Sequence, residues 1–320
     1  MRIPDWLADR LVSPKSGQPY QMTSHSSLQT EAGEKVPIQN DIPRFIQQEE
    51  YVESFGFQWN RFDVLQVEED ESTFELKVGV TLDQLAEKVV LDAGCGGGRY
   101  AWVAGKQGAK VIAVDRSQAV EKARRLTHDL PTVAVIQADL MELPLRQDSF
   151  DLVYSIGVLH HAPDTRAAFL RVAKMVRPGG RLSVWIYRKN RLPQEWLNNL
   201  LRAIGRRIPR GALLAACRGL ALLGGVPVLN RSLNKVFNFS NHPRWENRVC
   251  DNFDWYAPYY QHHHTLAEVM NWFRDAGYQE IRELNPLKSG QLYLRLFHGG
   301  WIIGSGVNVT GVRRANPFLG

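Results

Sequence analysis

The chain has 320 residues, of which 44 % are hydrophobic, so it is long enough for more than one average domain and apolar enough to bury a core. Its formal net charge is +6, and the excess lies in one segment, because residues 188–218 carry eight Lys or Arg against the single Glu195. Any basic surface is therefore expected in that segment and not over the rest of the chain.

The three cysteines, Cys95, Cys217 and Cys250, are odd in number and far apart in the sequence. This pattern excludes a disulfide framework and a Cys-x-x-Cys zinc knuckle, and it fits a reducing cytoplasm. The first ten residues mix charges early and lack the apolar run of a secretory signal. We therefore expect a cytoplasmic protein, which is membrane-peripheral if the basic segment lies on a membrane surface.

Residues 1–47 are rich in turn-forming residues and are predicted to form a small β module. Residues 13–17 read S-P-K-S-G where a zinc ribbon places its first knuckle, C-P-x-C-G, so the segment resembles a degenerate zinc ribbon. Serine is a poor zinc ligand and His25 is the only nearby candidate, so no metal is expected. The alternative is an irregular N-terminal extension.

A glycine cluster at residues 89–100, VVLDAGCGGGRY, follows a short apolar strand and opens a helix. The dinucleotide-binding pattern G-x-G-x-x-G, counted from Gly94, would need a glycine where Arg99 stands. Counted from Asp92, the pattern is instead D-x-G-x-G-x-G and ends at Gly98. It resembles motif I of the class I S-adenosylmethionine-dependent methyltransferases, although the loop by itself also fits a plain strand–turn–helix.

Further signatures follow in the order that this superfamily has. They are an apolar strand ending in Asp115, a strand leading to Asp139, a strand over 150–155, and a Pro-Gly-Gly turn before a fifth strand that ends at residue 187. The resemblance implies an α/β fold: a Rossmann-like seven-stranded sheet with an antiparallel last strand, a small N-terminal β module and a helical lid insertion. The expected divisions are 1–47 (β module), 48–187 (core with cap), 188–250 (lid), 251–300 (completion of the sheet) and 301–320 (tail).

The resemblance also implies S-adenosyl-L-methionine as the cofactor. This cofactor has an amino group and no phosphate, so a carboxylate beside the loop suits it, whereas a pyrophosphate would not. Asp115 is expected to hold the ribose hydroxyls, the alternative being a helix-capping role beside Ser117, and Asp139 is expected at the adenine. The predicted cofactor-binding residues are Asp92, Ala93, Gly94, Cys95, Gly96, Gly98, Asp115, Arg116, Ala138, Asp139, Leu140 and Ser155.

The aromatic-rich stretch at 54–62, SFGFQWNRF, precedes the core. It is interpreted either as a cap over the cofactor or as ordinary core aromatics. In the first case Phe57 or Trp59 would offer a cation–π contact to the sulfonium.

Methyl transfer needs an aligned nucleophile and exclusion of water, and a hydroxyl acceptor gains from a positioned base. His160 and His161 follow the fourth strand, at the sheet edge where ligands bind in such folds, so they are the candidate catalytic bases. The alternative is that one histidine packs under the cofactor while the other hydrogen-bonds backbone.

Residues 188–250 are predicted to form a helical lid. In PQEWLNNLLRAIGRRI, one helical face carries Trp196, Leu197, Leu200, Leu201, Ile204 and Ile208, with Arg202 and Arg206 opposite, which is a basic amphipathic helix. We expect 193–228 either to lie on a membrane surface or, alternatively, to pack its apolar face on the domain.

The stretch DNFDWYAPYYQHHHT at 251–265 combines aromatics and histidines. Tyr256, Tyr259 and His263 are predicted to contact the substrate, with core packing as the alternative. Three adjacent histidines do not share a helical face, so no metal site is expected. After a helix ending at Gly277, alternating strands at 278–284 and 291–297 are predicted to close the sheet as a hairpin.

These patterns predict an enzyme that transfers a methyl group to a small-molecule hydroxyl, on an amphiphilic or glycan-linked acceptor. An RNA methyltransferase is the first alternative, but no N/D-P-P-Y/F motif or cysteine follows the fourth strand, so a nucleic-acid partner is disfavoured. The second alternative is a non-catalytic cofactor-binding protein. A nicotinamide oxidoreductase is disfavoured by Arg99.

Overall fold

The computed structural model of the chain describes residues 3–24, 26–46, 67–189, 192–226, 236, 238–240, 242, 244–284 and 306–315. His25, the aromatic stretch at 54–62 with Phe57 and Trp59, and the predicted strand at 291–297 lie outside these ranges. The interpretations placed on them remain predictions.

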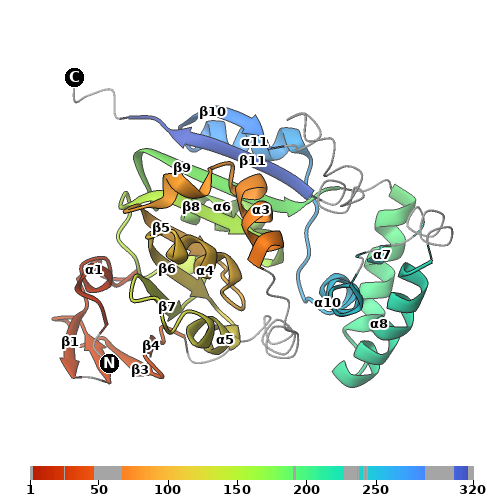
Figure 1. The fold of residues 1–320 in the computed structure, drawn as a ribbon, viewed down its shortest axis with the longest axis horizontal. Coiled ribbons are helices and arrows are strands. Elements are labelled where there is room, and N and C mark those ends of the chain that lie inside the picture. Colours follow the sequence, from red (N-terminus) through yellow and green to blue (C-terminus); the bar gives the residue numbers. More distant parts are fainter. Residues whose placement is uncertain are drawn as a thin grey trace.

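A seven-stranded mixed sheet with the order β10-β11-β9-β8-β5-β6-β7 forms the centre of the molecule (Figure 1). Strands β5 to β9 are parallel, and β11 runs antiparallel to both of its neighbours. This confirms the predicted Rossmann-like sheet with an antiparallel last strand. The strands are β5 (Val89–Ala93), β6 (Lys110–Asp115), β7 (Val133–Gln137), β8 (Phe150–Ile156), β9 (Val176–Tyr187), β10 (Tyr278–Glu283) and β11 (Gly306–Arg313).

Helices cover both faces of the sheet, which explains why its inner strands are apolar along their whole length. In β6, Val111 and Ala113 face one hydrophobic cluster while Ile112 and Val114 face the other. The first cluster includes side chains of α3 (Val67–Val78), α4 (Arg99–Lys106) and α5 (Ala119–Leu126), with the short η2 (Leu82–Leu85). The second includes α6 (Thr165–Ala173) and α11 (Leu266–Asp275), and α11 begins at a Thr265–Glu268 capping box.

β10 pairs with β11, which lies in the predicted tail at 301–320, whereas the predicted partner strand at 291–297 lies outside the described residues. β11 also pairs with β9, so it joins β10 to the rest of the sheet. Its glycines concealed it, because each leaves room for an aromatic ring. A Cβ on Gly306 would come within 2.2 Å of Trp185, and one on Gly311 within 2.9 Å of Phe273.

The N-terminal residues form the predicted small β module. After α1 (Asp5–Ala8), the strands β1 (Gln21–Ser24), β2 (Ser27–Gln29), β3 (Lys35–Gln39) and β4 (Ile42–Pro43) make a four-stranded antiparallel sheet. At the position of the first knuckle, Ser13 Oγ accepts hydrogen bonds from the amides of Lys15 and Ser16, both at 3.2 Å. Glu34 accepts from the Ser13 and Tyr20 hydroxyls at 2.7 and 2.6 Å, so hydrogen bonds tie this turn together.

This module is docked on the outer edge of the central sheet. Phe45 N donates to Gln137 O of β7 at 2.8 Å, and Arg44 donates to the Gln137 side chain at 2.6 Å and pairs with Glu121. Leu11 and Leu28 belong to the same hydrophobic cluster as the sheet. The module thus covers the β7 edge, which would otherwise present unpaired backbone groups.

The insertion after β9 is helical, with α7 (Leu192–Gly205), α8 (Arg210–Gly224) and α10 (Trp245–Tyr256), which lie together at one side of the sheet (Figure 1). It has its own core, which includes Leu213, Cys217 and Phe253. None of the helices in the described ranges is long and apolar enough to cross a membrane.

The predicted apolar face of α7 is divided, because Leu201 packs on the core of the insertion while Trp196, Leu200 and Ile204 face solvent. Asn198 and Arg202 are only 3 % and 9 % exposed, whereas Trp196 is 69 %, Ile204 49 % and Leu200 43 % exposed. The physical reason is a set of inward contacts: Asn198 Oδ1 accepts from Asn238 N at 2.9 Å, and the helix approaches the backbone of α10 closely at a glycine.

Candidate functional site

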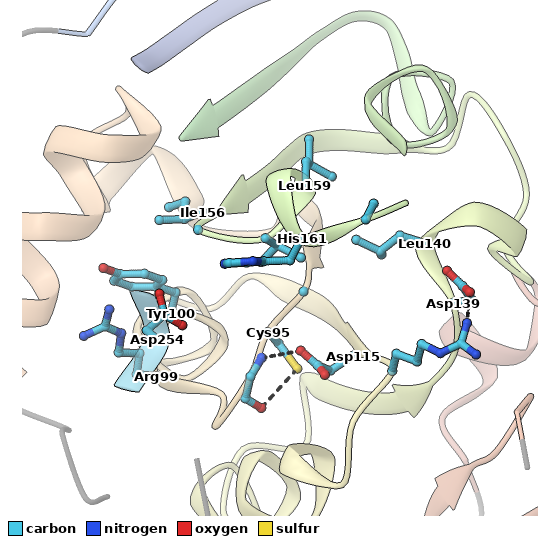
Figure 2. A pocket seen from close by; sticks show the side chains of 16 residues that line it. Cys95, Arg99, Tyr100, Asp115, Asp139, Leu140, Ile156, Leu159, His161 and Asp254 are labelled. Atoms are coloured by element: carbon cyan, nitrogen blue, oxygen red, sulfur yellow. Dashed lines mark hydrogen bonds and ion pairs between the residues drawn. The ribbon is translucent and has the colours of Figure 1, made fainter. Parts of the chain in front are cut away.

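A cleft opens at the carboxyl ends of β5, β6, β7 and β8, where ligands bind in doubly wound sheets (Figure 2). Seven of the predicted cofactor residues line it, together with His161. The lining residues are Gly94, Cys95, Gly96, Arg99, Tyr100, Asp115, Arg116, Asp139, Leu140, Ile156, Gly157, Val158, Leu159, His161, Ala162 and Asp254.

The glycine loop needs its glycines for close packing. Gly94 has φ +94°, and a Cβ on it would lie 2.4 Å from both methyl groups of Val158. A Cβ on Gly98, at φ +85°, would lie 2.7 Å from Ala123 Cα of the neighbouring helix. Gly98 therefore allows the close helix approach that the third glycine gives in dinucleotide-binding loops.

The amides of this loop are already used within the protein. Gly94 N and Cys95 N donate to Val114 O at 2.8 and 2.9 Å, and Gly96 N donates to Asp115 Oδ2 at 2.8 Å. A pyrophosphate needs backbone N–H donors directed at it and no adjacent carboxylate. The loop offers the opposite, a carboxylate and few spare donors, and this fits a nucleoside that carries an ammonium group and no phosphate.

Asp115 joins the end of β6 to the loop. Besides Gly96 N, its carboxylate accepts from Ser117 N at 2.8 Å and from Ser117 Oγ at 2.7 Å. A carboxylate has about four acceptor positions, so at most about one is left for a ribose hydroxyl. The capping role beside Ser117 is thus present, and the predicted contact with both hydroxyls would need donors to be displaced. Burial raises the pKa of Asp115, while these hydrogen bonds oppose that shift.

Asp139 lies at the end of the cleft opposite Tyr100 and Asp254 (Figure 2). Its Oδ1 caps η3 (Leu140–Glu142) by accepting from Met141 N at 2.9 Å, and its Oδ2 pairs with Arg116. Both charged side chains line the cleft. The predicted adenine contact at Asp139 thus has a carboxylate fixed by two partners.

The remaining predicted cofactor residues, Asp92, Ala93, Gly98, Ala138 and Ser155, do not line the cleft. Asp92 is 3 % exposed, and burial raises the pKa of its carboxyl to about 8. Ser155 Oγ donates to Ala93 O at 2.7 Å and so links β8 to β5. These side chains support the loop from beneath, and the predicted contact of Asp92 with the amino group has no surface in the cleft.

The two candidate bases are separated by the fold. Both belong to η4 (Leu159–His161), but only His161 lines the cleft. His160 is fully buried, with its ring centroid 4.0 Å from that of Tyr187. Burial lowers the pKa of both histidines, that of His161 to about 3.

The second chain segment that fixes His161 lies far away in sequence. Its Nδ1 is 2.9 Å from the carbonyl oxygen of Tyr260, which only accepts hydrogen bonds. Nδ1 therefore carries the proton of the neutral ring, and Nε2 carries the lone pair.

Asp254 is a site residue that sequence reasoning missed. It comes from α10, lines the cleft near Arg99 and Tyr100, and accepts a hydrogen bond from the Tyr187 hydroxyl (Figure 2). It lies within the aromatic stretch that was singled out. The only indication in the sequence is that Asp254 follows the buried Phe253, which places it at the margin of the packed face of α10.

None of the three predicted substrate residues lines this cleft. Tyr256 is buried in the insertion and donates to Asn238 O. Tyr259 is 56 % exposed, with the Arg206 guanidinium over its ring. His263 is buried and pairs with Glu195 of α7.

Residues 91–184 match the model of the methyltransferase domain family. The chain is similar to methyltransferase GfsG of Streptomyces halstedii, with 37 % identity over 115 residues, covering 32 % of this chain and 39 % of the relative. It is also similar to the ubiquinone biosynthesis O-methyltransferase of Idiomarina loihiensis, with 34 % identity over 125 residues, covering 38 % of this chain and 50 % of the relative. The chain thus spans half or less of the length of these relatives.

A solved structure, magnesium protoporphyrin IX methyltransferase from Synechocystis with bound S-adenosylhomocysteine, is similar at 18 % identity and a TM-score of 0.43, covering 83 % of this chain and 97 % of that one. Together, the sheet order, the glycine loop with its internally used amides and the family match have one explanation. Residues 91–184 match the methyltransferase domain family, and the seven-stranded sheet around them is the Rossmann-like fold of S-adenosylmethionine-dependent methyltransferases.

Proposed function

We propose that this protein transfers a methyl group from S-adenosylmethionine to a hydroxyl of a small-molecule acceptor, and that His161 Nε2 receives the hydroxyl proton. The observation that carries the proposal is the position of His161. Its ring lines the cleft, and the Tyr260 carbonyl holds its Nδ1 proton, which leaves Nε2 as the basic atom.

Some residues of the cleft would hold the cofactor, and others would bind the acceptor. When bound, S-adenosylmethionine supplies an activated methyl group on its sulfonium. The glycine loop, Asp115 and Asp139 are the groups that would hold it, through backbone carbonyls and carboxylates. Asp254, on the wall formed by the insertion, would orient a polar group of the acceptor.

The protonation state of His161 is set by its burial. Because burial lowers its pKa to about 3, the ring is neutral at physiological pH and Nε2 can accept the hydroxyl proton as the methyl group is transferred, but it is a weaker base than an exposed histidine.

The proposed transfer to an oxygen atom is also supported by a relative. A ubiquinone biosynthesis O-methyltransferase is among the relatives that match the domain, and its name states an oxygen target for that protein. An amphiphilic or glycan-linked acceptor belongs to the same proposal, since the helical insertion supplies part of the cleft wall through Asp254.

The experiment combines a methyl-labelled cofactor with a panel of phenolic, isoprenoid and sugar hydroxyl acceptors. With an acceptor that turns over, His161→Ala should lower kcat by about 10²- to 10⁴-fold. The affinity for S-adenosylhomocysteine, measured by calorimetry, should stay within about threefold of the original.

His160→Phe is the matched control, because it keeps an aromatic ring against Tyr187 and lies outside the cleft. It should retain kcat. Unchanged kcat in His161→Ala would remove this base from the mechanism, and label recovered only in an RNA fraction would overturn the small-molecule acceptor.

A further inference from the structure

The apolar side chains of α7 form an exposed row on its outer surface. Trp196, Leu200, Ile204 and the following Ile208 recur at intervals of four residues, and each is exposed. Residues at this interval lie on one side of a helix. A row of large apolar side chains that faces solvent marks an interaction surface.

The row cannot turn inward without breaking contacts that fix the helix. Asn198 accepts from Asn238 N, Arg202 is buried, and a Cβ on Gly205 would lie 2.7 Å from Tyr256 O. The inner side of α7 thus holds polar and small residues together with Leu201, which packs on the core of the insertion. These inner contacts hold the apolar side of α7 toward solvent, where no described residue covers it.

The charge around the row indicates the chemistry of that partner. Arg207 and Arg210 are exposed between the end of α7 and the start of α8, and Arg218 is exposed further along, whereas Arg206 is held by Tyr259. Between residues 192 and 226 the only carboxylate is Glu195, which pairs with His263. An apolar ridge bordered by cations and lacking exposed acids complements an anionic lipid surface.

We propose that the exposed side of α7, with the arginines at its C-terminal end, docks on an anionic phospholipid bilayer. A convex row needs no matching groove on its partner, and a bilayer receives such a row between its headgroups. Trp196 at one end has the amphipathic ring that favours the membrane–water interface.

Docking in this way would bring the acceptor side of the cleft toward the lipid. α10 packs against α7 and α8 and carries Asp254 into the cleft. This consequence rests on the proposed function, because it applies to an amphiphilic acceptor. The docking surface itself does not depend on turnover.

The experiment is sedimentation of the full chain with vesicles of phosphatidylcholine, with or without 30 mol % phosphatidylglycerol (a composition on the order of that of anionic membranes). The chain should bind the anionic vesicles at least about tenfold more tightly, and added salt should weaken the binding. The triple variant Trp196→Ser/Leu200→Ser/Ile204→Ser should lose binding to both vesicles. The variant Arg207→Gln/Arg210→Gln/Arg218→Gln should lose the preference for the anionic lipid.

A charge-matched control is Arg125→Gln/Arg171→Gln/Lys174→Gln, which removes three exposed cations on α5 and near α6, and it should bind like the original chain. Binding of S-adenosylhomocysteine by every variant verifies that each is folded. The proposal is overturned if the chain stays in the supernatant with anionic vesicles, or if the serine variant sediments equally. It is also overturned if the row instead mediates a dimer that the serine variant abolishes.

Discussion

The two halves of the cleft differ in how far apart in the sequence the residues that form them lie. On the cofactor side, Asp115 and Gly96 are 19 residues apart and belong to one strand–loop–helix–strand unit. On the acceptor side, His161 is fixed by Tyr260, which is 99 residues away, and Asp254 arrives on a helix of the insertion. The first half depends mainly on backbone, and the second depends on side chains brought together by the whole fold.

This difference has a functional reading. A cofactor common to many reactions can be held by a compact local unit, because its shape does not change. The acceptor side is assembled from an insertion and from loops at strand ends, which can vary without disturbing the sheet. Variants on the two sides should therefore fail in different ways.

The largest effect is expected for Gly94→Ala. The added methyl group would overlap the stiff Val158 side chain, and the alanine would have to keep a positive φ. We therefore expect a loss of about 4 kcal/mol in the free energy of unfolding, together with loss of S-adenosylhomocysteine binding. Urea denaturation and calorimetry would measure both.

Gly277→Ala is the matched control, since Gly277 also has a positive φ but nothing lies within 4 Å of its added Cβ. It should lose only about 1 kcal/mol and keep the affinity for the cofactor product. Equal losses in the two variants would show that backbone conformation alone, and not the contact with Val158, makes Gly94 necessary.

A smaller effect is expected for Asp115→Ala. Removing the carboxylate leaves Gly96 N and both Ser117 donors without their acceptor, so the loop loses its tie to β6. We expect affinity for S-adenosylhomocysteine to fall about 100-fold, equivalent to about 2.7 kcal/mol. Asp129→Ala, at an exposed position, is the control. A dissociation constant within threefold of the original would place the nucleoside away from this carboxylate.

The contrast between the halves also explains what the sequence could and could not predict. The meeting of the glycine loop with Asp115 could be predicted, because glycines at fixed spacing and an acid at a strand end belong to one local unit. Asp254 was not readable, because its entry into the cleft depends on how α10 packs against the insertion. Tyr256, from the same stretch, hydrogen-bonds inside that packing instead.

The strand β11 and the orientation of the helix α7 could not be predicted from the sequence pattern, and each has a physical reason. The strand β11 is rich in glycine because Trp185 and Phe273 occupy the space of its missing side chains, so its composition resembled a loop. For α7, the sequence pattern left open whether the apolar face lies on a membrane surface or on the domain, and in the structure Asn198 and Arg202 occupy the inner side. Amphipathicity predicted that α7 has two faces, and only tertiary contacts decided which one faces the domain.

On the acceptor side, the effect that can be measured without knowing the substrate is a pH dependence of stability. The folded pKa of His161 is lowered to about 3, below the ordinary value, so the unfolded chain binds more protons than the folded chain between about pH 6.5 and pH 3. The contribution of this residue to stability is complete above about pH 6.5 and falls as the pH is lowered. At pH 5 the loss should be about 2 kcal/mol.

His161→Asn isolates this term, because asparagine can donate to the Tyr260 carbonyl but does not titrate. Urea unfolding at pH 7.5 and pH 5 should show that the variant loses about 2 kcal/mol less than the original chain over that interval. His128→Asn, at an exposed position, should leave the interval unchanged. If His161→Asn is as acid-sensitive as the original chain, the ring is protonated without cost in the folded state. The acceptor side of the cleft would then be open to water, unlike the buried wall on which a neutral base depends.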